Sequence, residues 1–488
     1  MEERKGFGTN FGFLMAAVGS AVGLGNIWGF PNKMGASGGF TFLVIYLVLA
    51  VLCGFIVMVG ELALGRKTHH GAVGAYKALS KKFKWMGWLG ILSAFFILFF
   101  YCALGGYCIK YTVLNIGDLF HAGFGANALA ETAAANGNSL GAEVFGAFMS
   151  SPTEAIVFGL IFVAITMIIV IGGIGGGIEK VCSVGMPALF VMLLICIVRA
   201  CTLEGAVDGL KYMFVPGWAV ANGVIEEAPG FLTVLSTAGG QMFFSLSLGM
   251  GAMITSGSYL DKKENLQKNA LLIIIMDTLV ALMAGLCVIP GRFALDPTGA
   301  LGGPKLLFVT MQNVFSRMGG FGPIFGILFY LLVVFAAISS SISLLEVIVA
   351  HFVDKARNEG KGDMRKKYTL IAAACVGVGC ILVCADRLGD ASFTPWKLLN
   401  LPAESIRTWN DCWLDFWDML SEGIMMPLGA LLMSLMIGWE VGPDVVKEEC
   451  EASGHAMGSY GFFKICIKYI TPLIMIFVLY GQIKEFFF

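Results

Sequence analysis

Long runs of apolar residues alternate with short polar segments along the whole of this 488-residue chain. Most runs come close to the roughly twenty residues that an α-helix needs to cross a bilayer. The pattern predicts an all-α, polytopic membrane protein with about eleven transmembrane helices. The predicted spans lie near residues 11–33, 39–65, 86–112, 153–172, 183–202, 231–256, 269–290, 321–352, 369–385, 420–438 and 462–482.

Two of these runs are interrupted midway by small and polar residues. The first run contains the segment from Gly19 to Asn26, and the sixth contains the segment from Gln241 to Gly251. Non-helical backbone at membrane depth persists only where protein buries it or where it lines a polar cavity. An opened helix presents carbonyls that coordinate cations and amides that attract carboxylates. Matching breaks in spans one and six predict two inverted repeats around a central binding site; small-residue helix packing is the alternative.

Basic residues gather in alternate loops, and this asymmetry predicts the orientation of the chain. Segments 66–84 and 355–367 are rich in Lys and Arg, whereas segment 115–152 contains neither. The positive-inside rule therefore places the basic loops and the N-terminus in the cytoplasm. With an odd number of spans, we expect the C-terminus to be extracellular. The first span lacks a cleavage site and is expected to be retained, so we expect a multi-pass protein of the plasma (inner) membrane.

Composition supports this class and excludes others. The chain is 57% hydrophobic and 13% charged, with a net charge of -1. Such a chain has the lipid bilayer as its partner, and nothing in it indicates a nucleic acid or an obligate protein partner. The 13 cysteines form no CxxC pair and the five histidines no HExxH motif. We therefore expect neither a zinc site, nor a disulfide framework, nor an enzyme.

Several motifs resemble those of the neurotransmitter:sodium symporter family, in its bacterial amino-acid-transporter branch. They are Gly-Ser-Ala-Val-Gly-Leu-Gly-Asn-Ile-Trp at 19–28, followed by Phe30 and Pro31, and segments 61–66, 241–251 and 339–343. The resemblance implies a leucine-transporter-like fold of five plus five helices in inverted repeat, with helices 1 and 6 unwound. It implies one transmembrane domain over 1–488, with repeat one about 8–205, repeat two about 228–440 and an extra helix about 460–483. It also implies sodium-coupled import of an amino acid by alternating access.

The resemblance implies two sodium sites built from oxygen ligands, which hard cations prefer. The residues carried over for sodium one are Ala21, Asn26, Ser245 and Asp277. Those carried over for sodium two are Gly19, Val22, Ala336, Ser339 and Ser340. Hydrogen bonding between helices is the alternative role for the two serines. Sodium ions, transported together with the substrate, are therefore the expected cofactors.

Asp277 is the most informative residue of this set, because it lies inside an apolar run. A carboxylate at the centre of a membrane helix costs roughly 2.5–3.5 kcal/mol on insertion scales, so it normally has a partner. Chloride-dependent members of the family have a neutral ligand at this position. We therefore expect Asp277 to supply the fixed negative charge itself, which makes transport chloride-independent. The alternative is a structural aspartate that caps a neighbouring helix.

The resemblance also implies a substrate site at the two breaks. Its expected residues are Ala21, Leu24, Gly25, Ile97, Tyr101, Phe244, Ser245, Ser247, Met250, Ser340 and Leu344. The amides of Leu24 and Gly25 and the hydroxyl of Tyr101 are expected to receive a substrate carboxylate. Gly23 leaves room for that carboxylate, which favours an amino acid over a decarboxylated amine. The remaining apolar wall favours a hydrophobic or aromatic side chain.

The expected gates match the family only in part. The gate residues carried over are Arg4, Asp354, Tyr101, Phe244 and Asp418. In the family the outer acid pairs with an arginine, and this chain has Gly29 at that position, which removes a bidentate clamp. Either another cation such as Lys33 or Arg407 closes the gate, or aromatic residues close it, or the space admits a larger substrate. A non-transporting or differently coupled amino-acid sensor on the same fold is therefore the alternative function.

Overall fold

The computed structural model describes residues 8–300, 303–400 and 411–487, and within these ranges every regular element is helical. The first part comprises α1 (Asn10–Ala21), η1 (Gly25–Gly29), α2 (Phe30–Ala36), α3 (Phe40–Leu49), η2 (Ala50–Gly54), α4 (Phe55–Thr68), α5 (Ala72–Leu79), α6 (Met86–Leu119), η3 (Ala126–Leu129), α7 (Ala130–Asn136), α8 (Leu140–Met149), α9 (Pro152–Ile171), η4 (Ile174–Glu179) and α10 (Lys180–Cys201).

The second part comprises α11 (Ala206–Phe214), α12 (Trp218–Ala221), α13 (Phe231–Ser245), α14 (Ala252–Gly257), α15 (Leu266–Leu295), α16 (Gly303–Lys305), η5 (Leu306–Thr310), α17 (Met311–Ser316), η6 (Gly319–Phe321), α18 (Gly322–Asn358), α19 (Arg365–Ala385), η7 (Arg387–Gly389), α20 (Pro395–Leu399), α21 (Trp413–Asp418), η9 (Met419–Met425), α22 (Met426–Leu435), η10 (Met436–Val441), α23 (Asp444–Glu451), α24 (Tyr460–Ile465), η11 (Cys466–Ile470) and α25 (Thr471–Phe487). The all-α prediction is confirmed.

Nine helices among the described residues are long and apolar enough to cross a membrane. The pair α1 and η1–α2, bent by 46° at its break, makes a tenth when it is counted as one span. These helices fall on ten of the predicted spans. The other predicted span, 231–256, contains α13 and α14 with a non-helical segment between them. The total of eleven spans therefore stays a prediction.

The backbone leaves the α-helix where the sequence places its glycines. After α1 ends, Val22 adopts an extended conformation, with φ -73° and ψ 108°. Between α13 and α14, Gly249 and Gly251 have φ of 82° and 78°, and Ser247 has φ of 54°. Glycine adopts positive φ without steric cost, so two of the three left-handed residues here are glycines. Both interruptions therefore follow from local sequence.

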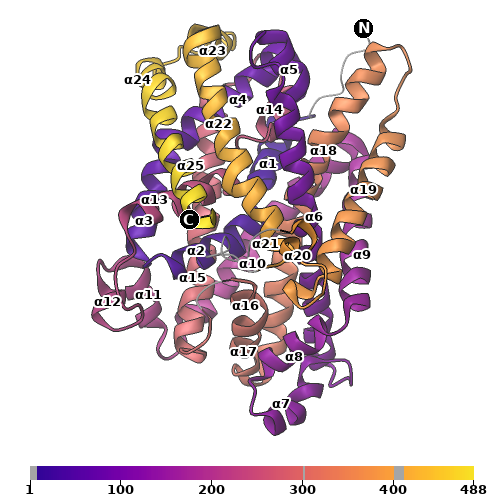
Figure 1. Cartoon of the computed structure of the whole chain (residues 1–488), viewed down its shortest axis with the longest axis vertical. Coiled ribbons are helices and arrows are strands. Elements are labelled where there is room, and N and C mark those ends of the chain that lie inside the picture. The colour runs from indigo at the N-terminus through magenta and orange to yellow at the C-terminus, as the bar shows by residue number, and fades with distance from the viewer. Residues whose placement is uncertain (1–7, 301–302, 401–410, 488) are drawn as a thin grey trace.

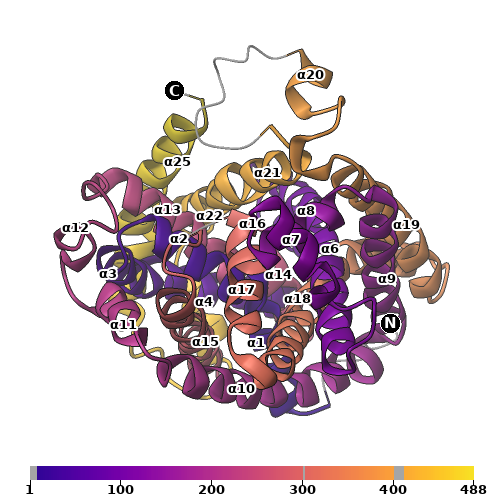
Figure 2. The ribbon, with the colours of Figure 1, turned by 90° about the horizontal axis from the view of Figure 1, so that it is seen from below.

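The helices form an elongated bundle, with different short helices at its two ends (Figure 1). Helices α5 and α23 lie at one end, hereafter the α5 end, and α7, α8 and α17 lie at the other, hereafter the α17 end. Viewed from the α17 end, α7, α8, α16 and α17 lie across the middle of the bundle (Figure 2). Inside it, α6 and α18 pack along each other over much of their length.

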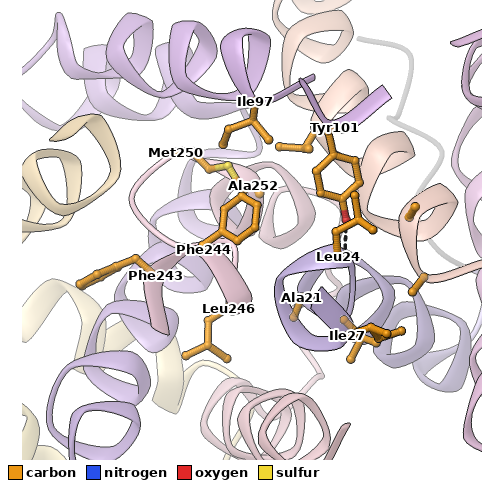
Figure 3. Close-up of a cluster of buried hydrophobic side chains, with 14 of the residues drawn as sticks. Ala21, Leu24, Ile27, Ile97, Tyr101, Phe243, Phe244, Leu246, Met250 and Ala252 are labelled. Atoms are coloured by element: carbon orange, nitrogen blue, oxygen red, sulfur yellow. Dashed lines mark hydrogen bonds between the residues drawn. The ribbon is translucent and has the colours of Figure 1, made fainter. Parts of the chain in front are cut away.

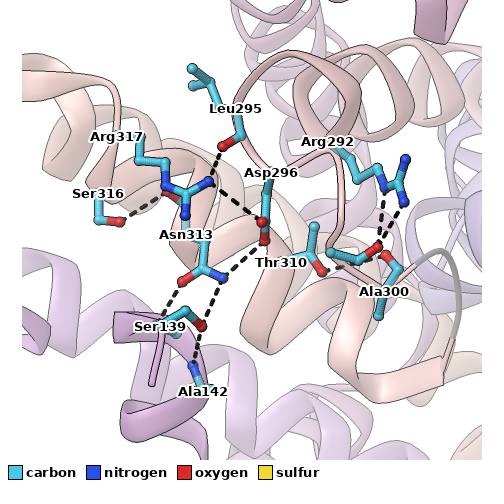
Figure 4. Close-up of polar contacts among 12 residues, drawn as sticks. Ser139, Ala142, Arg292, Leu295, Asp296, Ala300, Thr310, Asn313, Ser316 and Arg317 are labelled. Carbon is cyan, nitrogen blue, oxygen red and sulfur yellow. Dashed lines mark hydrogen bonds and ion pairs between the residues drawn. The ribbon is translucent and has the colours of Figure 1, made fainter. Parts of the chain in front are cut away.

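A polar cluster fastens the short helices at the α17 end (Figure 4). The Asn313 side chain of α17 accepts a hydrogen bond from the amide of Gly141 at 2.7 Å and donates to Asp296 Oδ2 at 2.9 Å. It also donates to Ser139 Oγ at 3.1 Å, just before α8. The buried side-chain amide of Asn313 thus links α8, α17 and the residue that follows α15 by hydrogen bonds.

Candidate functional site

The two interrupted segments lie side by side and enclose a small cavity. It is lined by Ser20, Ala21, Gly23, Gly25, Ile97, Tyr101, Phe244, Ser247, Met250, Ser340 and Leu344. Nine of the eleven predicted substrate residues are among them. The other two, Leu24 and Ser245, hydrogen-bond nearby through the Leu24 amide and the Ser245 hydroxyl. Ser20 was not predicted as a lining residue, although it stands in the same small-residue segment as Gly19 and Ala21.

One wall of the cavity is apolar and aromatic (Figure 3). Ile97 and Tyr101, one turn apart on α6, face Phe244 at the end of α13 and Met250 beyond it. The rings of Tyr101 and Phe244 meet edge to face, with centroids 6.4 Å apart. The centre of a water molecule fits within only about 10 Å³ of the enclosed space. A bound side chain of any size must therefore be accommodated by movement of these walls.

Polar donors converge where helix α1 breaks. The Leu24 amide donates a hydrogen bond to the Tyr101 hydroxyl at 2.8 Å. A Cβ atom at Gly23 would lie 2.2 Å from both Ser340 Oγ and the Tyr101 hydroxyl, so only glycine fits there. These N–H and O–H groups are the donors that a carboxylate accepts from, and they lie at a broken helix end, where backbone amides lack partners within the helix.

Three of the residues predicted for sodium one form a single buried cluster. Asn26 Nδ2 donates to Asp277 Oδ1 at 2.7 Å and to Ser245 Oγ at 2.9 Å. Ser245 Oγ donates in turn to Asp277 Oδ2 at 2.9 Å. All three side chains are fully buried. Ala21, the fourth predicted ligand, lines the adjoining cavity.

Tyr46 is a member of this cluster that sequence reasoning missed. Its hydroxyl lies 3.4 Å from Asp277 Oδ2, at the long end of the hydrogen-bond range, while its ring packs against Phe30 and Phe42. Its only signal in the sequence was one hydroxyl in the apolar run of α3. Asn26, Ser245 and Tyr46, the hydrogen-bond partners of Asp277 among the described residues, are all neutral. A buried carboxylate with neutral partners suits a bound cation.

The five residues predicted for sodium two also lie together. Ser339 Oγ donates to the Ala336 carbonyl at 2.9 Å and lies 3.3 Å from the Val22 carbonyl. Ser340 Oγ lies 3.1 Å from the Gly19 carbonyl and 3.2 Å from that of Val22. Because α1 ends at Ala21, carbonyls in its last turn receive no hydrogen bond from an N–H of the same helix. They can therefore accept from other groups or bind a cation. Five oxygens from α1, the following residue Val22 and α18 thus lie close together, and oxygen ligands are those that a hard cation prefers.

Three further contacts hold the broken segments in place. Gln241 Nε2 donates to the Gly25 carbonyl at 2.7 Å, and Ser247 Oγ donates to the Ser20 carbonyl at 2.8 Å. Glu61, fully buried in α4, accepts a hydrogen bond from the Gly249 amide at 2.7 Å. The contacts of Ser247 and Glu61 satisfy backbone groups beside the interruptions. The Gly25 carbonyl also accepts a hydrogen bond from the Phe30 amide, so Gln241 is its second donor. The signal for Glu61 was a carboxylate inside an apolar run.

The predicted gate residues are only partly described. Arg4 and Arg407 lie outside the described residues, whereas Asp354 borders a cavity at the α5 end. Lys33 forms an ion pair with Glu422 rather than with the predicted Asp418. A Cβ atom at Gly29 would lie 2.8 Å from Gln241 Oε1. Gln241 therefore fills the space beside Gly29, and that space does not enlarge the cavity.

Comparisons with known proteins agree with this geometry. The model of the sodium:neurotransmitter symporter family matches residues 4–121 and 151–394. An uncharacterized sodium-dependent transporter, YhdH, of Bacillus subtilis (strain 168) is 32% identical over 487 residues, covering 96% of each chain. An uncharacterized sodium-dependent transporter of Haemophilus influenzae is 30% identical over 489 residues, covering 97% of each chain. The crystal structure of MhsT in complex with L-phenylalanine matches with a TM-score of 0.83 at 30% identity, covering 98% of this chain and 100% of that one.

The family match includes both interrupted segments and the serines of α18. Its members are transporters rather than enzymes, and the small-molecule substrate and sodium dependence carry over with membership. The chain therefore belongs to the sodium:neurotransmitter symporter family and is a multi-pass, sodium-dependent membrane transporter.

Proposed function

We propose that this protein imports a hydrophobic or aromatic amino acid together with sodium, by alternating access and without chloride. The observation that carries the proposal is the Asp277 cluster. Asp277 is fully buried, and its described hydrogen-bond partners Asn26, Ser245 and Tyr46 are neutral. A membrane-buried carboxylate with neutral partners is stabilised by a cation beside it. Its fixed charge also replaces the anion that chloride-dependent relatives need.

The second sodium site rests on the oxygens of Gly19, Val22, Ala336, Ser339 and Ser340. Two of these groups are hydroxyls and three are carbonyls, so the site carries no formal charge of its own. Sodium bound there would fasten the end of α1 to α18. A change in this fastening is one means by which cation binding affects the position of a broken helix.

The substrate assignment rests on the donors beside Gly23 and on the aromatic wall. The Leu24 amide and the Tyr101 hydroxyl suit a carboxylate, and Gly23 admits no side chain that would compete for them. Phe244 and Met250 suit an apolar side chain. The structural neighbour MhsT was crystallised with L-phenylalanine, which fits this class. In this proposal Tyr101 and Phe244 close over the substrate, and Arg4 with Asp354 close the α5 end.

The orientation follows from the basic loops. Lys77, Lys84 and Lys355 lie at the α5 end, which we assign to the cytoplasm, and the α17 end then faces outward. The protein would lie in the plasma membrane, with its C-terminus outside.

The test is uptake of an amino-acid mixture into proteoliposomes under inward sodium or potassium gradients, with chloride or gluconate as the anion. Internal amino acids are read by mass spectrometry. We expect sodium-dependent accumulation of one or a few apolar or aromatic amino acids, unchanged when gluconate replaces chloride. Sodium-dependent binding without accumulation would instead favour an amino-acid sensor. Strict chloride dependence would disprove the role given to Asp277.

A further inference from the structure

Lys33 and Glu422 form an ion pair that joins α2, the half of the broken first span beyond Gly25, to η9. Lys33 lies on α2, eight residues beyond Gly25, or about 12 Å along a helix. Glu422 lies in η9, and the side chains of Lys33 and Glu422 are 22% and 7% exposed. Such partly buried pairs couple more strongly than exposed ones, because solvent screens them less.

Two more carboxylates act electrostatically on the same ammonium group. Asp418, one turn before Glu422, and Glu485, near the end of α25, both lie within electrostatic reach of Lys33. Asp418 Oδ1 is buried and has no hydrogen-bond partner within the described part of the chain. Lys33, Asp418, Glu422 and Glu485 are hereafter the gate cluster. One cation thus acts on acids from α21, η9 and α25.

Within the gate cluster, Glu422 lies close to the cavity, on the side of the α17 end. A Cβ atom at Gly240 of α13 would lie 3.5 Å from Glu422 Oε1, so Glu422 packs over Gly240. Phe244, which lines the cavity, lies four residues further along α13, about 6 Å on the helix. Gln241, between them, reaches the Gly25 carbonyl. The ion pair therefore sits about one helical turn beyond the aromatic wall.

Other described cations at the α17 end are held by different groups. Arg292 donates to the Gly299 carbonyl at 2.9 Å. Arg317 contacts Leu295 and Asp296, and Arg387 donates to the Asp390 carbonyl. Lys33 is the cation that acts electrostatically on Asp418.

We infer that Lys33, through Glu422 and Asp418, closes the outer side of the substrate pathway in place of the arginine that Gly29 lacks. This inference rests on the proposed function. A path from the α17 end to the cavity must separate α2 from η9, and the ion pair holds them together. Because Glu485 also acts electrostatically on Lys33, α25 contributes to this closure, although it lies outside the two predicted five-helix repeats.

The test measures access to the cavity without any substrate. Cysteine replaces Ile97, a cavity residue, in a background where Cys375 and Cys201, which are not buried, are changed to serine. An impermeant thiol reagent is applied to right-side-out and inside-out membrane vesicles, and labelling is read by intact mass. We expect Lys33→Gln and Glu422→Gln to raise the labelling rate roughly tenfold from the α17 end only, the scale of a typical coupling energy.

Three variants distinguish loss of a gate from a general loss of structure. The double change Lys33→Glu with Glu422→Lys reverses the pair and is expected to bring labelling back toward the parent rate. Lys305→Gln removes an exposed lysine of α16 at the same end and is expected to leave the rate unchanged. Lys33→Arg keeps the charge and stays near the parent rate, so it reports on the gate even where Lys33→Gln reaches the membrane poorly.

Parent-like labelling of a folded Lys33→Gln variant would overturn the inference, as would an equal increase in Lys305→Gln. Absence of sodium-dependent amino-acid uptake by the unchanged protein would disprove the proposed function instead. The labelling result stands in either case, because it needs no substrate.

Discussion

At the scale of single residues, the site contains positions at which substitution is expected to abolish binding. Asp277 carries the one formal charge of its buried cluster, and Gly23 touches two hydroxyls that no Cβ atom could approach. Asp277 contributes its negative charge, whereas Gly23 contributes the room left by the absence of a side chain. Their variants should therefore fail in different ways.

Asp277→Asn is expected to weaken sodium-stimulated substrate binding by at least about tenfold, or about 1.4 kcal/mol. The amide keeps the shape and removes the charge that attracts the cation. Thermal melting in sodium-free buffer should stay the same or rise, since burial of the amide costs less than burial of the carboxylate, whereas stabilisation by added sodium should disappear. Asp208→Asn, in the exposed part of α11, is the control. A large loss of stability without sodium would indicate a structural cap instead.

Gly23→Ala is expected to abolish substrate binding and to lower stability by about 1–3 kcal/mol, the usual cost of overpacking. The added methyl group would lie 2.2 Å from Ser340 Oγ and the Tyr101 hydroxyl. Gly185→Ala in α10 is the matched control, because its Cβ would meet no atom within 4 Å. It should be neutral or stabilise the helix by roughly 0.5–1 kcal/mol. Binding isotherms and melting curves measure both variants, and normal binding by Gly23→Ala would contradict the site.

At the scale of elements, the two broken helices are held by groups from intact ones. Glu61 of α4 bonds the Gly249 amide, and the serines of α18 contact the end of α1. At the α17 end, Asn313 does the same for short helices that lie across the bundle. Regular helices thus supply the partners that irregular backbone lacks.

Asn313→Ala is expected to lower stability by about 1–3 kcal/mol, because it leaves the Gly141 amide and Asp296 without their shared partner. Amide hydrogen exchange in α8 should accelerate, since that helix loses its fastening to α17. Asn222→Ala removes an exposed side chain that bonds only its own turn, and it should change little. Unchanged amide hydrogen exchange in α8 would show that Asn313 does not hold α8 against α17.

At the scale of the whole molecule, the proposed transport step moves charge across the membrane. A zwitterionic amino acid with two sodium ions carries two positive charges inward. The limiting accumulation should then rise about tenfold per charge for every 59 mV of inside-negative potential. Potentials set with potassium and valinomycin test this in proteoliposomes at fixed sodium. A slope of one charge would contradict net inward movement of two charges, and would fit either one sodium ion or two sodium ions with one cation returned. No slope would indicate electroneutral transport.

Much of the fold and of the site could be predicted, because glycines and polar residues stand out within the apolar runs that cross a membrane. Helix-breaking glycines from Gly19 to Gly25 and the polar groups of Asn26 and Asp277 raise the free energy of an apolar membrane helix. Their presence there therefore indicates a functional role. Tyr46 and the ion pair of Lys33 with Glu422 could not be predicted in the same way. Tyrosine is common in apolar helices, and a lysine near a helix end has many candidate partners along a long chain.

The sequence by itself determined the all-α membrane fold, the position of both breaks and the residue types able to bind a cation, because hydrophobic period and local backbone preference act within a few residues. Only the tertiary structure decided which of these residues meet. It brought Asn26 to Asp277, Gln241 into the space beside Gly29 and Lys33 to Glu422, contacts between residues more than 200 positions apart. Such contacts depend on how the helices pack and on which groups long side chains reach. Neither can be predicted from a local sequence pattern.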